Sequence, residues 1–163
     1  MRNIFLCLFV MLTPALATAQ GASVPFGGLE HDSTLPIEIS ADQLAIDQQN
    51  GNVVFTGNVV VGQGDMRLSA DTMRVQYSAG EGMTGEIHTI LAEGNVVMVN
   101  GSEAAEADQA EYMVADGIVN LSGNVILTQG QNALSAGAMS IDLNTGTAQM
   151  SGRVGTILQP EGN

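Results

Sequence analysis

The sequence predicts an all-β fold, a single-domain twisted β-jellyroll or β-solenoid of antiparallel strands built from four repeats of about 29 residues. Three observations predict it: a recurring Gly-Asn-Val motif, apolar residues that alternate with polar ones, and turn residues between the alternating segments. The repeat glycines Gly57, Gly94, Gly123 and Gly152 are separated by 37, 29 and 29 residues. A fixed spacing of this length is the sequence signature of a repeat architecture.

Apolar residues alternate with polar ones around each repeat glycine, which is the pattern of strands with one buried face. They stand two and four positions before the glycine in every repeat, and two and four positions after it in the first three. Around Gly57, for example, Phe55 precedes the glycine and Val59 and Val61 follow it. The sequence gives almost no sign of helices. We therefore expect the apolar side chains of all repeats to share one interior.

Turn residues separate the expected strands. Asn50-Gly51, Asp116-Gly117 and Asn144-Thr145-Gly146 supply the positive φ angles that tight hairpin turns require. One connection, around Ser78–Gly82, is longer. The Gly-Asn pair in mid-strand predicts a bulge or corner where the chain bends. The result should be two facing, strongly twisted sheets that enclose an apolar slot and leave strand edges open at both ends.

The first 19 residues are expected to be a cleaved signal peptide. Arg2 gives a basic start, Ile4–Leu12 is an apolar run, and Ala17–Ala19 places small residues at a cleavage site. The apolar run is shorter than the roughly 20 residues that span a bilayer. Cys7, the sole cysteine, lies in the segment to be removed, so we expect neither a disulfide nor a lipid anchor. The periplasm of a Gram-negative bacterium is the expected location.

The remaining chain is long enough for one domain. We expect a flexible leader over residues 20–35, a β-jellyroll domain over 36–160 and a tail over 161–163. The net charge is −13 and the chain contains no lysine. Nucleic acid is therefore excluded as a partner, because binding phosphates requires a basic surface.

Several segments resemble the LptA/OstA family of periplasmic lipopolysaccharide transport proteins. Pro36–Asp42 is similar to the opening strand of that family, and Gly51–Val59 is similar to its most recognisable stretch. Gln63–Asp71 continues the similarity, which returns at Leu121–Asn124. The resemblance covers roughly residues 35–158.

The resemblance implies an OstA-like β-jellyroll whose apolar groove shields the lipid A acyl chains of lipopolysaccharide. It implies a bridge that carries lipopolysaccharide from an inner-membrane export complex to an outer-membrane translocon. The implied partners are LptC-like and LptD-like jellyroll domains, together with further copies of the chain joined head to tail by strand addition. No cofactor is implied.

The expected lipid contacts come from two sources. Ile37 and Ile39 are carried over from the opening strand of the family, near one end of the groove. The others are apolar residues on the inward face of the alternating pattern. The full set is Ile37, Ile39, Phe55, Val59, Val61, Leu68, Met73, Val75, Tyr77, Met98, Tyr112, Leu121, Leu127, Ile141 and Met150.

Other functions have less support in the sequence. The polar residues repeat like a solvent face and do not converge, so we expect no enzyme. His31 and His88 lack the spacing of metal ligands. The recurrent Asp42, Asp71 and Asp108 are expected to cap turns or face solvent. An alternative function remains: a structural or adhesive exported β-repeat protein with a dry packed core and no lipid ligand.

Overall fold

The computed structural model describes residues 22–26, 32, 34–47, 51–78 and 85–157. These residues form eleven β-strands. The described part of the chain contains no helix long and apolar enough to cross a membrane.

The strands follow one another along the chain, and the six central ones are the longest. Their bounds are β1 (Ala22–Pro25), β2 (Glu38–Ser40), β3 (Gln43–Asp47), β4 (Asn52–Gln63), β5 (Met66–Tyr77), β6 (Ile87–Asn100), β7 (Glu103–Met113), β8 (Ile118–Gln129), β9 (Asn132–Asp142), β10 (Thr147–Ser151) and β11 (Gly155–Ile157).

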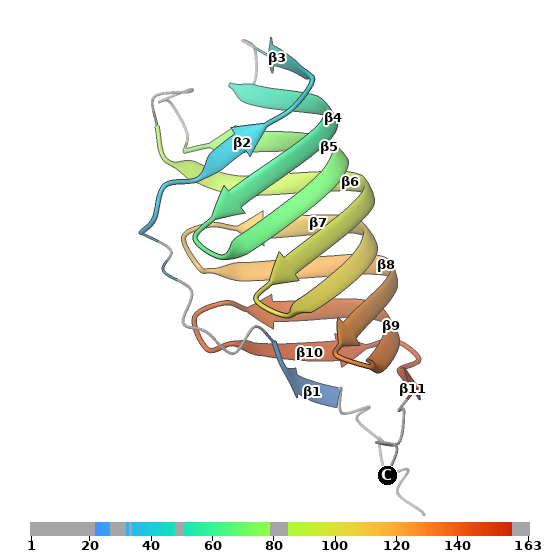
Figure 1. Ribbon diagram of the computed structural model, residues 1–163. Helices are drawn as coiled ribbons and strands as arrows, with labels where there is room; N and C mark the ends of the chain where they lie inside the picture. The colour runs from blue at the N-terminus through green and yellow to red at the C-terminus, as the bar shows by residue number, and fades with distance from the viewer. Residues whose placement is uncertain (1–21, 27–31, 33, 48–50, 79–84, 158–163) are drawn as a thin grey trace, which may run out of the picture.

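The strands form a folded antiparallel stack, in which each long strand bends once and contributes to two facing half-sheets (Figure 1). The β3 half-sheet begins at β3, which pairs with residues 52–56 of β4, and ends with β10 and β1. The β2 half-sheet begins at β2, which pairs with residues 60–62 of β4, and ends with β11. This arrangement confirms the predicted all-β jellyroll.

The bends lie at the repeated Gly-Asn pairs, as the sequence predicts. The register between β4 and β5 shifts between Thr56 and Val59, on either side of Gly57-Asn58. Equivalent shifts occur at the other two Gly-Asn pairs. Among the described residues, the non-glycine residues with positive φ are those that follow the four repeat glycines: Asn58, Asn95, Asn124 and Arg153. The predicted corners are therefore confirmed.

The core lies between the half-sheets. It consists of alternating side chains from every long strand, as expected for strands with one face turned inward. The largest fully buried side chains include Tyr112, Met73 and Ile141. The ends of the long strands and their hairpin turns lie on the side opposite the corners (Figure 1), and we call the opening between the two half-sheets on that side the mouth.

The expectation of a flexible leader over residues 20–35 is wrong for its described residues 22–26. Ala22–Pro25 form β1, which pairs with β10 in the register Ala22↔Met150 to Pro25↔Thr147. Phe26 is fully buried in the core, and its N–H donates to the carbonyl of Gly146. The short segment is ordered because its alternating apolar residues continue the inward face of the β3 half-sheet. The expected signal peptide and tail lie outside the described residues.

A candidate lipid groove

The structure brings all fifteen residues of the predicted lipid-contact set to one interior. Eleven of them are at most 1% exposed, and four are half-buried and packed against the core. The half-buried ones are Ile37, Ile39, Phe55 and Tyr77. They come from the first strands of the stack and the segment leading into it, where fewer neighbours cover the interior. Their contact with lipid stays a prediction.

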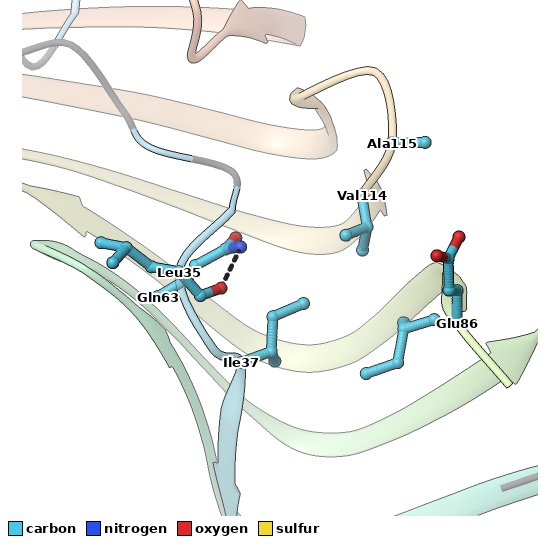
Figure 2. A pocket seen from close by; sticks show the side chains of 7 residues that line it. Leu35, Ile37, Gln63, Glu86, Val114 and Ala115 are labelled. Carbon is cyan, nitrogen blue, oxygen red and sulfur yellow. Dashed lines mark hydrogen bonds between the residues drawn. The ribbon is translucent and has the colours of Figure 1, made fainter. Parts of the chain in front are cut away.

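A pocket of about 400 Å³ opens at the mouth near this end of the stack (Figure 2). The segment before β2 forms one wall, and the ends of β4, β6 and β7 form the rest. The lining residues are Leu35, Ile37, Gln63, Glu86, Ile87, Val114 and Ala115. Of the predicted contacts, only Ile37 lines the pocket, because the others lie deeper between the half-sheets.

A polar chain connects the interior to the segment at the mouth. The Tyr112 hydroxyl donates to Oε1 of Gln63 at 2.6 Å, and Nε2 of Gln63 donates to the Leu35 carbonyl at 2.9 Å. Burial raises the pKa of Tyr112 to about 12, because the phenolate would lose its hydration. Tyr112 is therefore a neutral hydrogen-bond donor at physiological pH.

The amide side chains at the mouth were missed by our reading of the sequence. Gln63, Asn100 and Gln129 each stand six residues after a repeat glycine. They therefore continue the inward face, and Gln63 and Asn100 are 1% and 4% exposed. Gln63 donates to the Leu35 carbonyl, and Gln129 donates to the Pro25 carbonyl at 2.6 Å. Two repeat amides thus hold the N-terminal segment. The alternation of inward-facing residues, continued from the fourth to the sixth position after each repeat glycine, would have predicted them.

The recurrent aspartates stabilise the corners. Oδ2 of Asp71 accepts a hydrogen bond from Nδ2 of Asn95 at 2.8 Å. The same bond joins the next aspartate and asparagine, Asp108 and Asn124, and the first pair, Asp42 and Asn58, at the same distance. The expectation that these acids cap turns or face solvent was therefore incomplete. They are exposed, but each also holds the side chain of a corner asparagine.

Both ends of the stack leave strand edges unpaired. At the β2–β3 end, Leu44 and Ile46 are 51% and 50% exposed, although they pair with Phe55 and Val53 on the inward face. The outer edges of β2 and β3 have no strand partner in the described structure. At the opposite end, β1 and β11 are the last strands of the two half-sheets, and their outer edges also have no strand partner in the described structure. Ile157 of β11 is 69% exposed.

These features define a β-jellyroll module with a continuous apolar interior, a mouth along one side and unpaired strand edges at both ends. The model of the family described as LptA/(LptD N-terminal domain) LPS transport protein matches residues 38–147. The chain belongs to this family.

Individual proteins are also similar to this chain. The chain is 31% identical over 158 residues to an uncharacterized protein of Rhizobium meliloti (strain 1021), covering 92% of this chain and 85% of that one. It is 32% identical over 112 residues to the lipopolysaccharide export system protein LptA of Escherichia coli (strain K12), covering 63% of this chain and 57% of that protein.

A solved structure shares the fold. The crystal structure of LptH, the LptA homologous periplasmic component of the lipopolysaccharide transport device of Pseudomonas aeruginosa, superposes with a TM-score of 0.68. The two sequences are 20% identical, and the match covers 80% of this chain and 99% of that one.

Proposed function

We propose that this chain is a periplasmic lipopolysaccharide transport bridge, which shields lipid A acyl chains in its apolar interior. The observation that carries the proposal is the continuous inward face of the family fold, which opens to solvent at the mouth. Each CH₂ group of an acyl chain in water costs about 0.8 kcal/mol. A route across an aqueous compartment therefore needs an apolar lining from end to end.

The interior is suited to a ligand of variable shape because methionines form much of it. Their flexible, unbranched side chains fill irregular gaps and adapt to different neighbours. Buried methionines occur on three of the long strands, β5, β6 and β9, and on β10: Met66, Met73, Met98, Met139 and Met150. Acyl chains would enter at the mouth and displace contacts among these side chains, with no catalytic step.

The bridge would form by strand addition at the ends of the stack. The uncovered β2–β3 end offers two strand edges together with exposed apolar side chains. The partners proposed are further copies of the chain, an LptC-like domain at the inner membrane and an LptD-like domain at the outer membrane. Export by residues 1–19 belongs to the same proposal.

Native mass spectrometry of the chain from Gln20 onward, titrated with purified lipopolysaccharide, tests the function. Ile39→Glu places a charge on the inward face of β2 and should abolish saturable binding. Ser40→Glu is the matched control, because Ser40 is exposed on the same strand and its side chain points away from the interior. Equal binding by both variants would contradict the proposed groove.

The same titration tests the alternative function, a structural or adhesive repeat protein with a dry packed interior. Its distinguishing result is a folded protein that takes up no lipopolysaccharide at any concentration. Circular dichroism of each variant establishes that the β-fold is intact.

A further inference from the structure

β1 occupies a strand edge that a second copy of the chain could use. β10 is the last strand of the β3 half-sheet contributed by the repeats, and β1 adds to its outer edge. The inward-facing residues of β1 are Ala22 and Val24, which pair with Met150 and Ala148, and Phe26 follows them into the core. β1 thus completes the interior at this end of the stack.

A second copy would present its β2 and β3 to the same end. In the stack, each strand that crosses from the β3 half-sheet to the β2 half-sheet is followed by one that returns in the opposite direction. β10 and β11 form such a crossing, with Gly152-Arg153 at the corner. The next returning pair would be β2 and β3 of a following copy, antiparallel to β11 and β10 respectively. β1 therefore stands where β3 of that copy would add.

The two strands are interchangeable in pattern. β3 carries Leu44 and Ile46 on alternate positions, and Val24 of β1 and the following Phe26 stand in the same way on either side of Pro25. β3 has five residues and β1 has four, and a second copy would also add β2 to β11. The exchange would bury two side chains that are half exposed in the single chain. It would replace a strand ending in Pro25, which lacks an N–H, with one that contains no proline.

From this geometry we infer that β1 is a self-capping strand: it closes the β10 edge in the free protein and leaves that edge when β3 of a second copy adds to β10. Gln129 holds the cap through the Pro25 carbonyl, and Phe26 anchors it in the core. The inference rests on the proposed end-to-end assembly and adds a condition to it. Association of copies must release β1.

A reversible cross-link between β1 and β10 tests the inference. Ser23 and Gln149 face each other across the two strands, and both are exposed on the outer face. The Phe26 N–H donates to the Gly146 carbonyl at 2.9 Å, so the preceding pair, Pro25 and Thr147, is one without backbone hydrogen bonds. Ser23 and Gln149 therefore form the same kind of pair, in which side chains approach closely. In the chain from Gln20 onward, which contains no native cysteine, Ser23→Cys/Gln149→Cys should form a disulfide.

Sedimentation velocity should show that the oxidised variant remains monomeric, whereas the reduced variant associates as the unmodified chain does. We expect oxidation to raise the apparent dissociation constant of self-association by about 100-fold. The control is Asn120→Cys/Ser140→Cys, in which the two residues face each other on β8 and β9 with side-chain oxygens 2.8 Å apart. Its disulfide leaves β1 free, and oxidation should not change association.

Identical association of the oxidised and reduced Ser23→Cys/Gln149→Cys proteins would overturn the inference, as would failure of the disulfide to form in the folded protein. A chain that remains monomeric when reduced would overturn it too. Lipopolysaccharide binding is measured separately. A chain that associates only when β1 is released but binds no lipopolysaccharide would contradict the proposed function and leave the self-capping strand intact.

Discussion

The Tyr112 hydroxyl lies 2.6 Å from Oε1 of Gln63, and 49 residues separate the two in the chain. The bond joins β7 to the end of β4 within the interior. Because Gln63 in turn donates to the Leu35 carbonyl, it also fixes the segment that leads into β2. A buried polar pair therefore determines how one wall of the mouth is held.

Tyr112→Phe should lower the free energy of unfolding by about 1–2 kcal/mol, because Oε1 of the buried Gln63 loses its donor. Urea unfolding measures the change. Tyr77→Phe is the control, since Tyr77 is only half-buried, and it should change the stability by less than about 0.5 kcal/mol. A larger loss in the control than in Tyr112→Phe would contradict the role of the buried pair.

The same variant should alter the response to alkaline pH. The pKa of Tyr112 is raised from 10.0 to about 12 in the folded protein. Above pH 10 the unfolded chain therefore loses this proton while the folded chain retains it, so stability falls as the pH rises toward 12. In Tyr112→Phe this part of the decline should vanish. Unfolding curves between pH 9 and pH 12 would show parallel slopes if the assignment is wrong.

Gly94→Ala should destabilise the second corner more than a comparable change in a hairpin. Gly94 has φ +79°, and a Cβ there would lie 2.6 Å from Oδ2 of Asp71. Gly130 has φ +60° with nothing within 4 Å, so Gly130→Ala carries only the conformational penalty, about 1 kcal/mol. We expect the cost of Gly94→Ala to exceed that of Gly130→Ala by at least about 1 kcal/mol in thermal or urea unfolding.

The double variant Asp71→Ala/Gly94→Ala separates the two causes. Removing the carboxylate relieves the contact, so the double variant should lose less stability than the sum of the single variants. Additive losses would mean that the corner aspartate does not constrain the glycine.

Leu44→Glu should weaken end-to-end association by tenfold or more, because it places a charge on the uncovered end of the interior. Leu44 is already 51% exposed, so the free energy of unfolding should fall by about 1 kcal/mol or less. Sedimentation velocity measures association. Gln43→Glu, one residue earlier on β3, adds the same charge with the side chain turned away from the inward face, and it should associate normally.

Gln129→Ala should loosen β1 without unfolding the stack. The variant removes the 2.6 Å hydrogen bond to the Pro25 carbonyl. Amide hydrogen exchange of residues 22–24 should accelerate by about tenfold, the factor for a loss of about 1.4 kcal/mol. Exchange in β5 and β6 should stay unchanged. Uniform acceleration along the whole chain would indicate global destabilisation instead.

The sequence predicted the strands, the interior and the corners because all three follow from short-range periodicity. Val59 and Val61 face inward since they lie two and four residues after Gly57, and the Gly-Asn pairs bend the chain because both residues adopt positive φ. The facing of a strand and the position of a corner depend only on residues close together in the sequence. Both patterns also recur in each repeat, which makes them easier to recognise.

Two features required contacts that the pattern does not contain. Asp71 and Asn95 are 24 residues apart, and nothing in their spacing shows that the side chains meet at a corner. β1 was missed because it holds only four residues, ends in Pro25 and pairs with β10, more than 120 residues later. A short apolar alternation next to glycines carries little strand signal on its own.

β1 and β2 lie at opposite ends of the stack, yet only twelve residues of chain separate Pro25 from Glu38. Eight strand-to-strand steps separate the two strands, which is about 38 Å at the usual spacing. The thirteen Cα–Cα steps from Pro25 to Glu38 reach about 45 Å at most. Interstrand hydrogen bonds point along the stack, so a pulling force in this direction would part the strands one gap at a time. The covalent link limits that elongation to a few ångströms while β1 remains on β10. A module under tension would therefore be stiff while β1 is paired with β10, and extensible once β1 has dissociated from β10.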